Sequence, residues 1–387
     1  INGFRRGQTS DGFYRGPDGE WDSNGAVLWL VRRHFELTRS NLWLRSLYPS
    51  LRRAGTWIIE QRRRSRRTST THEGLMPRSL SAEHLGTVDQ YYWDSLFSLA
   101  GLRELSAIAV DCRKTSDAAD WKREADAMAD DLRASLHEVE RRLGTPLVPA
   151  TPSRDFDESA IGSVAGVYPL RVEAIAEDAF RATVRGLKDR YVRAGGFLHP
   201  FIHSGYNPYL TLQIAHAELW MGDVDRAWET AWTILRQSGP PYSLPEAIHP
   251  RTGGGSMGDG HHGWAAAEIV LFLRDCLVDD RGEALHLLAG AGPLFEGRDP
   301  AMTIEALPTR FGKFDLRMLV ESNGDIHFEF EPSFFFGNGP AGVTLHLPFP
   351  LRRVLPSSPT HLCEVVRTAH GTVIHFTPEV RSAMLLR

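Results

Sequence analysis

One carboxylate, Glu246, stands in a segment, SLPEAIHPRTGGGSMGDGHHGW (residues 243–264), that is too rich in glycine and proline to be a helix. Its glycines allow the backbone to adopt positive φ and to approach a ligand closely. Apolar residues at helical spacing resume at residues 265–275, so the segment leads into a buried helix. The polar and aromatic groups that we expect to contact a ligand here are Arg251, Asp259, His262 and Trp264. The alternative is a plain surface turn.

Two more loops combine acidic and aromatic residues, GPDGEWDSNG (residues 16–25) and SAEHLGTVDQYYWD (residues 81–94). Aromatic rings stack on the apolar C–H faces of sugars, while carboxylates and histidines bind hydroxyl groups, so these loops predict a carbohydrate site. The residues expected to bind substrate are Trp21, Asp22, Glu83, His84, Tyr92, Trp93 and Asp94 and, from HSGYNPY (residues 203–209), His203, Tyr206 and Asn207. Alternative roles are a helix cap for Asp22 and a first-turn acid for Asp94.

Glycoside hydrolysis uses two carboxyl groups. One protonates the leaving oxygen, and the other activates water or attacks directly. The three loops supply candidates for both roles, provided that the fold brings them together.

The helices expected between these loops indicate how the fold brings the loops together. Helical periodicity begins at about residue 23 and recurs at residues 41–62, 91–110, 117–142, 159–167, 172–191, 209–221, 224–237 and 264–277. Nearly apolar helices alternate with amphipathic ones, and long polar loops precede the apolar ones. We therefore predict a ring of helical hairpins with the long loops all at one end.

Beyond about residue 281 the apolar pattern changes to period two, at residues 302–304, 314–320, 326–331, 343–347, 365–367 and 373–376. The predicted fold class is therefore mainly α, with a catalytic domain over residues 1–280 and a small C-terminal β-sandwich over residues 281–387.

Composition excludes several classes of function. A net charge of −4 argues against nucleic acid as a partner, and no apolar run is long enough to span a membrane. Three separated cysteines make neither a disulfide framework nor a metal motif, and the adjacent His261 and His262 have no third ligand at metal spacing. We expect no metal and no cofactor. No signal peptide is visible, which favours a cytoplasmic location, although a chain that begins with Ile leaves targeting open.

Three segments in order carry a family resemblance: DSNGAVLWLVRRHFELTRSNLWLRSLYPSLRRAGTWI, the acidic loop ending in YYWDS, and PEAIHPRTG followed by HGWAAAE. Together they resemble the (α/α)6-barrel glycosidases, most closely glycoside hydrolase family 63 and its glucoamylase- and trehalase-like relatives. The resemblance covers roughly residues 11–277. It departs in helix number, because a full barrel has a dozen helices and this chain has about nine or ten. Either a first hairpin lies upstream of Ile1 or a partner closes the ring.

The resemblance implies specific roles. In that family a loop of the form ENYxPxTG before a WSAA helix carries the general base, which implies this role for Glu246. The general acid is an Asp in an ESGxDxxxxWD segment, which SAEHLGTVDQYYWD matches only with altered spacing. Asp89 is the expected acid, with Asp94 and Glu83 as alternatives. Family members invert the anomeric centre, and a carboxyl separation of roughly 6.5–9.5 Å would agree with inversion.

The sequence thus predicts an inverting hydrolase acting on an α-linked oligosaccharide or glycoside. A non-catalytic carbohydrate-binding or regulatory protein on the same scaffold is the main alternative. A phosphorolytic or transferase reaction, with Arg251 and the glycine run holding an anion, is a third. The sugar, the linkage and the oligomeric state do not follow from the sequence.

Overall fold

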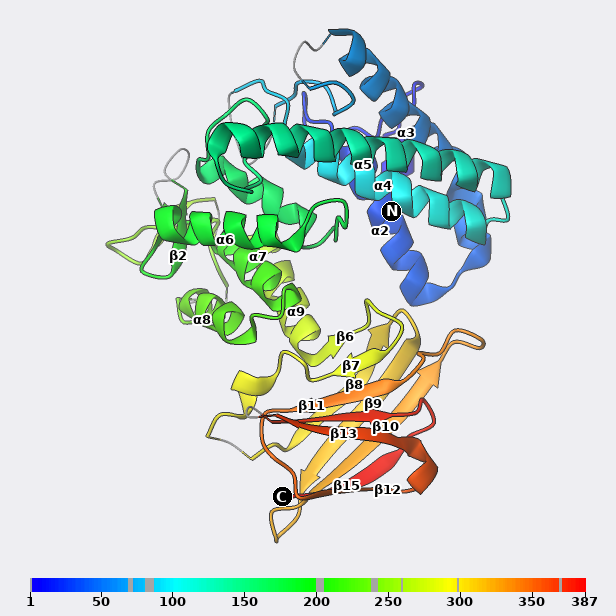
Figure 1. The fold of residues 1–387 in the computed structure, drawn as a ribbon, viewed down its shortest axis with the longest axis vertical. Coiled ribbons are helices and arrows are strands. Elements are labelled where there is room, and N and C mark those ends of the chain that lie inside the picture. Colours follow the sequence, from blue (N-terminus) through cyan, green and yellow to red (C-terminus); the bar gives the residue numbers. More distant parts are fainter. Residues whose placement is uncertain are drawn as a thin grey trace. The chain divides into compact units, whose positions relative to one another are not determined.

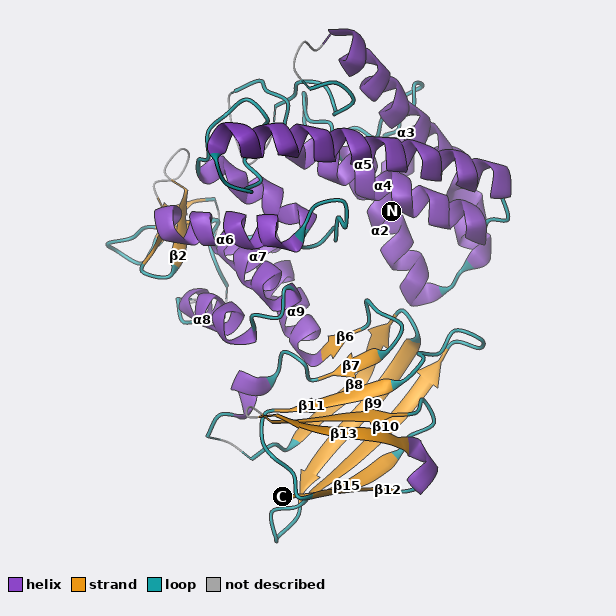
Figure 2. Cartoon of the chain, viewed as in Figure 1, coloured by secondary structure: helices purple, strands orange, loops and turns teal. Residues whose placement is uncertain are grey.

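A computed structural model describes residues 2–68, 72–80, 87–199, 205–237, 243–258, 260–297, 299–368 and 371–387. The chain divides into two compact units, the mostly helical Ile1–Ala266 and the mostly β-stranded Ala267–Arg387 (Figures 1 and 2). The predicted order of a helical part followed by a β part is confirmed. The division falls within helix α9 (Gly263–Leu277), which runs directly into strand β6 (Val278–Asp279), and the domain boundary at residue 280 stays a prediction.

The first unit is built mainly from helices, and the sequence periodicity predicts all of them except the short α1. In chain order these are α1 (Asn2–Arg6), α2 (Ser23–Thr38), α3 (Asn41–Thr68), α4 (Tyr92–Asp111), α5 (Thr115–Leu143), the 3-10 helix η1 (Glu158–Gly166), α6 (Glu177–Tyr191), α7 (Pro208–Trp220), α8 (Val224–Leu235) and the start of α9.

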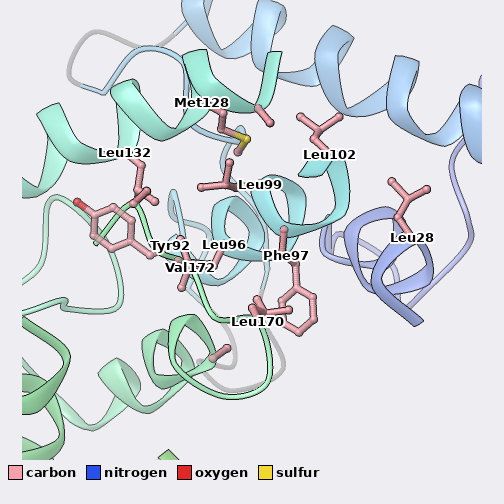
Figure 3. Close-up of a cluster of buried hydrophobic side chains, with 14 of the residues drawn as sticks. Leu28, Tyr92, Leu96, Phe97, Leu99, Leu102, Met128, Leu132, Leu170 and Val172 are labelled. Carbon is pink, nitrogen blue, oxygen red and sulfur yellow. The ribbon is translucent and has the colours of Figure 1, made fainter. Parts of the chain in front are cut away.

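Helices α4 and α7 are buried along most of their length, because they carry apolar residues on all sides. Helix α4 packs against α2, α3, α5 and η1, and α7 packs against α8 and η1. Figure 3 shows the core around α4, where Leu96 and Leu99 lie among side chains from α5 and from the segment after η1. By contrast, the buried residues of α5 recur every three or four positions, as expected for a helix with one solvent face.

Helices α2 and α4 approach each other through glycine. A Cβ atom on Gly101 would lie 2.7 Å from the Cα of Gly25, and one on Gly25 would collide with the backbone carbonyl of Phe97. Only hydrogen fits at either position, so the two backbones are in direct contact. This contact sets the separation of the two helices where the first turn of α2 passes the middle of α4.

Two predicted helices differ in detail. The helix expected at residues 159–167 is the 3-10 helix η1 (Glu158–Gly166), since glycine and β-branched residues in ESAIGSVAG weaken an α-helix of this length. The helix expected from residue 172 begins at Glu177, where Glu177 and Asp178 place negative charge in the first turn.

A small sheet that the sequence analysis did not predict lies within the first unit. Its strand order is β1 (Val192–Arg193), β2 (Gly196–His199), β3 (Gly205–Tyr206), β4 (Ala247–Ile248) and β5 (Gly255–Met257). All four pairings are antiparallel. This sheet joins the start of α7 to the segment that carries Glu246.

The second unit contains two five-stranded sheets around one apolar core. Buried and exposed residues alternate along its long strands, as predicted. The first sheet has the order β12 (Arg353–Pro356), β15 (Ser382–Leu386), β10 (Ile326–Phe334), β9 (Gly312–Val320) and β8 (Met302–Thr309). The second has the order β13 (Leu362–Thr368), β14 (Gly371–Phe376), β11 (Val343–Leu347), β7 (Leu285–Leu287) and β6.

Candidate functional site

The N-terminal ends of α2 and α4 are joined by a side-chain hydrogen bond. Nε1 of Trp93 donates to Oδ2 of Asp22 at 2.9 Å. Asp22 occupies the position before α2, but its side chain makes no cap hydrogen bond there. Burial raises the pKa of Asp22, and the bond from Trp93 opposes that rise. The structure therefore gives this carboxyl group a partner on another helix in place of the cap role.

Asp94, in the first turn of α4, is the most deeply buried of these carboxyl groups, with 1% of its surface exposed. The hydroxyl of Ser79 donates a hydrogen bond to Oδ2. Burial raises the pKa of Asp94 well above its ordinary value, and the negative charge of Asp22 adds to the rise. A carboxyl group in this environment holds its proton at pH values where an exposed one has lost it.

The segment before α2 is held against the segment before α4. The backbone N–H of Leu80 donates to the carbonyl of Gly19 at 2.8 Å, and Nε1 of Trp21 donates to the carbonyl of Arg78 at 3.0 Å. Glu20 lies on the same segment, and burial together with the charge of Asp22 raises its pKa. Glu20, Asp22 and Asp94 thus form one acidic cluster, which we call the proton-binding cluster.

Asp89 lies next to this cluster but is held differently. Its backbone pairs with Ser79 through N–H to carbonyl bonds of 2.8 and 3.1 Å. Its carboxylate accepts hydrogen bonds from the hydroxyl groups of Thr151 at 3.2 Å and Ser153 at 3.1 Å. Ser79 therefore contacts both acids, Asp89 through its backbone and Asp94 through its side chain. Ser79, Thr151 and Ser153 were not singled out from the sequence, although all three lie in loops that precede α4 or η1.

Glu246 stands at the open end of the β4–β5 hairpin. Ala247 pairs with Met257, which brings Glu246 opposite Gly258. A Cβ atom on Gly258 would lie 2.8 Å from both Cβ and Oε2 of Glu246, so the glutamate side chain occupies the space that a side chain at position 258 would need. Further along, the N–H of His262 donates to the carbonyl of Leu244 at 2.8 Å and closes the segment.

Aromatic rings gather where α7 and α9 begin. Tyr209 lies 5.6 Å from Trp264 and 6.5 Å from His262, measured between ring centroids, in edge-on arrangements. Trp264 is 59% exposed, so much of its ring is open to a ligand. Tyr206 is buried in β3, where it pairs with Ile248 of β4. Arg251 is exposed at the turn of the hairpin.

Two residues expected at the site serve the fold. Tyr92 is 0% exposed, and its hydroxyl group is hydrogen-bonded to Ser135 of α5 at 2.7 Å, as its place in the core of Figure 3 suggests. Asn207 is buried and caps α7, with Oδ1 accepting the N–H of Leu210 at 2.9 Å. We leave both out of the candidate site. Four of the expected residues lie outside the described part of the chain: Glu83, His84, His203 and Asp259.

Among the residues that the structure describes, no group of three or more His, Cys, Asp or Glu side chains could hold a metal ion. Within the same residues, no helix is both long and apolar enough to cross a membrane. The described carboxyl groups of Asp22, Asp89, Asp94 and Glu246 are of the type that transfers protons in catalysis.

No protein-family model matches the sequence, and no curated protein matches it. Solved structures do resemble the fold. An alpha-L-rhamnosidase from Dictyoglumus thermophilum is 13% identical, with a TM-score of 0.57 over 100% of this chain and 43% of that one. A Streptomyces avermitilis alpha-L-rhamnosidase, solved with L-rhamnose, is also 13% identical, with a TM-score of 0.57 over 99% of this chain and 35% of that one. The chain spans less than half the length of either protein, and at this identity the likeness shows a shared fold.

Proposed function

We propose that this protein is an inverting glycoside hydrolase that cleaves an α-linked bond in a small saccharide or glycoside. The observation that carries the proposal is the proton-binding cluster of Glu20, Asp22 and Asp94, where burial raises the pKa of three neighbouring carboxyl groups, and which Ser79 links to Asp89. A glycosidase needs one carboxyl group that keeps its proton and a second that is ionised. The fold shared with two alpha-L-rhamnosidases supports this reaction class.

On this proposal the helical unit forms an (α/α)6 toroid related to glycoside hydrolase family 63 and its clan, and the second unit forms a β-sandwich. The alternation of buried helices α4 and α7 with amphipathic helices α5 and α8 supports a toroid. The single apolar core between the two five-stranded sheets supports a sandwich.

We assign Glu246 as the general base, which removes a proton from the attacking water. Asp89 is the proposed general acid, and its hydrogen bonds from Thr151 and Ser153 fix the direction of its carboxyl group. Asp94 is the main alternative, because its raised pKa suits proton donation, but it has to reach the substrate from a nearly closed position. Glu83 is the third candidate.

The substrate would bind between the acids and the aromatic residues. Trp264 and Tyr209 offer ring faces and edges for a sugar, and Trp93, Arg251 and His262 offer further contacts. An L-rhamnoside belongs in the substrate panel, since the Streptomyces avermitilis structure contains L-rhamnose.

The test is release of reducing sugar from a panel of α-linked disaccharides and aryl glycosides, with the product anomer followed by NMR. Wild-type protein should release the β-anomer first. Glu246→Gln should lose nearly all turnover, on the order of 10³-fold or more, while remaining folded and able to bind sugar. Full activity in Glu246→Gln would refute the assignment of the base.

The acid is identified with the variants Asp89→Asn, Asp94→Asn and Glu83→Gln. An aryl glycoside with an acidic phenol needs little protonation of its leaving oxygen, whereas a disaccharide needs it fully. Loss of the general acid should therefore reduce disaccharide cleavage far more than aryl glycoside cleavage. The variant that loses disaccharide cleavage but keeps most aryl glycoside cleavage identifies the acid. A variant that loses both activities equally excludes that residue as the acid.

A non-catalytic carbohydrate-binding protein is the second candidate. The exposed ring of Trp264 favours it, because such a ring binds sugars without any acid. Sugar binding that weakens in Trp264→Ala, together with no release from any substrate, would select this function.

A further inference from the structure

The side chain of Glu246 lies so close to Gly258 that it restricts which residue can occupy position 258. Strands β4 and β5 pair through Ala247 and Met257, and Gly258 follows that pair with a φ of +66°. A Cβ atom at this position would come within 2.8 Å of two atoms of Glu246, its Cβ and its carboxylate Oε2. Real Cβ atoms essentially never make contacts shorter than 3.0 Å. The space that any side chain would need at position 258 is therefore already occupied by the glutamate.

This arrangement restricts the carboxylate. A glutamate has three side-chain torsions and, at a half-buried position, several accessible rotamers. Both Cβ and Oε2 of Glu246 lie 2.8 Å from the point where a Cβ of residue 258 would stand, so the glutamate side chain curves around that point in one of those rotamers. A general base works only when its oxygen is held within about half an ångström of the position that the attacking water requires.

We infer that Gly258 is a positioning residue for Glu246, and that position 258 must lack a side chain so that the carboxylate points at the water. The inference rests on the proposed function, because it gives Glu246 the role of base. It adds a requirement on a residue that touches neither the substrate nor the transferred proton.

The same hairpin segment offers a matched control. Gly253 has a φ of +68°, and a Cβ atom built on it meets nothing within 4 Å. Gly253→Ala and Gly258→Ala therefore introduce the same unfavourable backbone conformation for an L-residue. Only Gly258→Ala also forces the Glu246 carboxylate to move. A third variant, Gly258→Asn, carries a Cβ but tolerates positive φ better than alanine, which separates the contact from the backbone strain.

Steady-state kinetics provide the first readout. Gly258→Ala and Gly258→Asn should lower kcat by about 100-fold with little change in KM, since a displacement of about 1 Å in a catalytic group has that effect. Gly253→Ala should stay within about threefold of wild type. The limb of the pH profile that reports the base should also move in the Gly258 variants and not in Gly253→Ala. Equal effects of the two alanine variants would overturn the inference.

A second readout does not need turnover. In protein labelled with ¹³C at glutamate carboxyl groups, the resonance that disappears in Glu246→Gln belongs to Glu246. The chemical shift and titration midpoint of that resonance should change in both Gly258 variants and stay the same in Gly253→Ala. If Glu246→Gln keeps full activity, the proposed function fails, and the resonance still shows whether Gly258 positions Glu246. If Glu246→Gln is inactive and the resonance is unmoved in the Gly258 variants, only the positioning role fails.

Discussion

The indole nitrogen of Trp93 lies 2.9 Å from a carboxylate oxygen of Asp22, and this hydrogen bond joins the first turn of α4 to the residue that precedes α2. The two residues are far apart in the sequence, and the glycine contact between the same two helices sets their separation. Asp94 follows Trp93 directly and feels the charge of Asp22. The proton-binding cluster therefore depends on how α2 and α4 pack.

Trp93→Phe should weaken this junction. Removing the donor leaves a largely buried carboxyl group without its indole partner, which should lower the free energy of unfolding by about 1–2 kcal/mol at pH 7. The pKa of Asp22 should rise further, because the bond from Trp93 lowers it in the native protein. Urea denaturation and ¹³C NMR of the carboxyl groups measure the two effects. Trp21→Phe is the control, since Trp21 donates to a backbone carbonyl, and an unchanged Asp22 pKa in Trp93→Phe would contradict the prediction.

Asp94→Asn should stabilise the protein at neutral pH. The folded pKa of Asp94 is raised above the unfolded value near 3.9, so its ionisation costs stability as pH rises through the folded pKa. The cost is about 1.4 kcal/mol for every tenfold change in the acid constant. The amide keeps an oxygen for the Ser79 hydroxyl but carries no charge. In thermal denaturation, Asp94→Asn should have a higher Tm than wild type at pH 7, and this difference should shrink toward pH 4.

Asp89→Asn provides the matched comparison for Asp94→Asn. Its carboxylate accepts bonds from Thr151 and Ser153, and an amide accepts them less strongly. We expect a loss of about 1 kcal/mol in the free energy of unfolding at pH 7. Stabilisation by both asparagine variants would show that the two acids are held alike, contrary to the structure.

The His346 side chain in the second unit should make the stability of the protein decrease in acid. Burial, together with the charges of His286 and His375, lowers the pKa of His346 to about 4. Because the folded pKa lies below the unfolded value near 6.5, stability should fall as pH decreases from about 6.5 toward 4. His346→Gln should flatten this dependence in urea denaturation curves recorded at several pH values. His327→Gln, on the other sheet, should leave the curves unchanged, and equal flattening by both variants would exclude a special role for His346.

Gly25→Ala tests the helix contact itself. Its new methyl group would meet the Phe97 carbonyl, which is backbone and cannot move aside, so we expect a loss of about 1–3 kcal/mol despite the better helix propensity of alanine. Gly55→Ala in α3 should cost less, since its methyl group meets side-chain atoms of Leu105 and Trp121 and no backbone. If chemical denaturation showed the same loss in the free energy of unfolding for Gly25→Ala and Gly55→Ala, α2 and α4 would separate easily.

The helices and the long strands were predictable because their apolar residues recur at the right spacing over many positions. The sheet β1–β5 was not, since strands of two to four residues contain too few positions for any period to appear. The direction in which the Tyr92 side chain points could not be predicted from the sequence either. Helix α4 is apolar on all sides, so nothing in its pattern indicates that Tyr92 faces the core while Trp93 faces Asp22.

The candidate site shows the same limit. Residue types and loops drew attention to Asp22, Asp94 and Glu246, because acids beside aromatic residues stand out in a sequence. The residues that contact Asp94 and Glu246 are a serine and a glycine, Ser79 and Gly258, which are common loop residues and carry no distinctive signal. Long-range pairing, which only the folded backbone specifies, distinguishes these two from the rest.

The glycine contact between α2 and α4 also has a consequence for recognising distant relatives. Most core positions accept exchange among apolar residues of similar volume, so their identity fades as sequences diverge. Gly25 and Gly101 admit no such exchange while the two backbones touch. The pair therefore gives a fixed reference for aligning sequences whose remaining residues have changed, and from that reference the positions equivalent to Asp22, Trp93 and Asp94 can be counted.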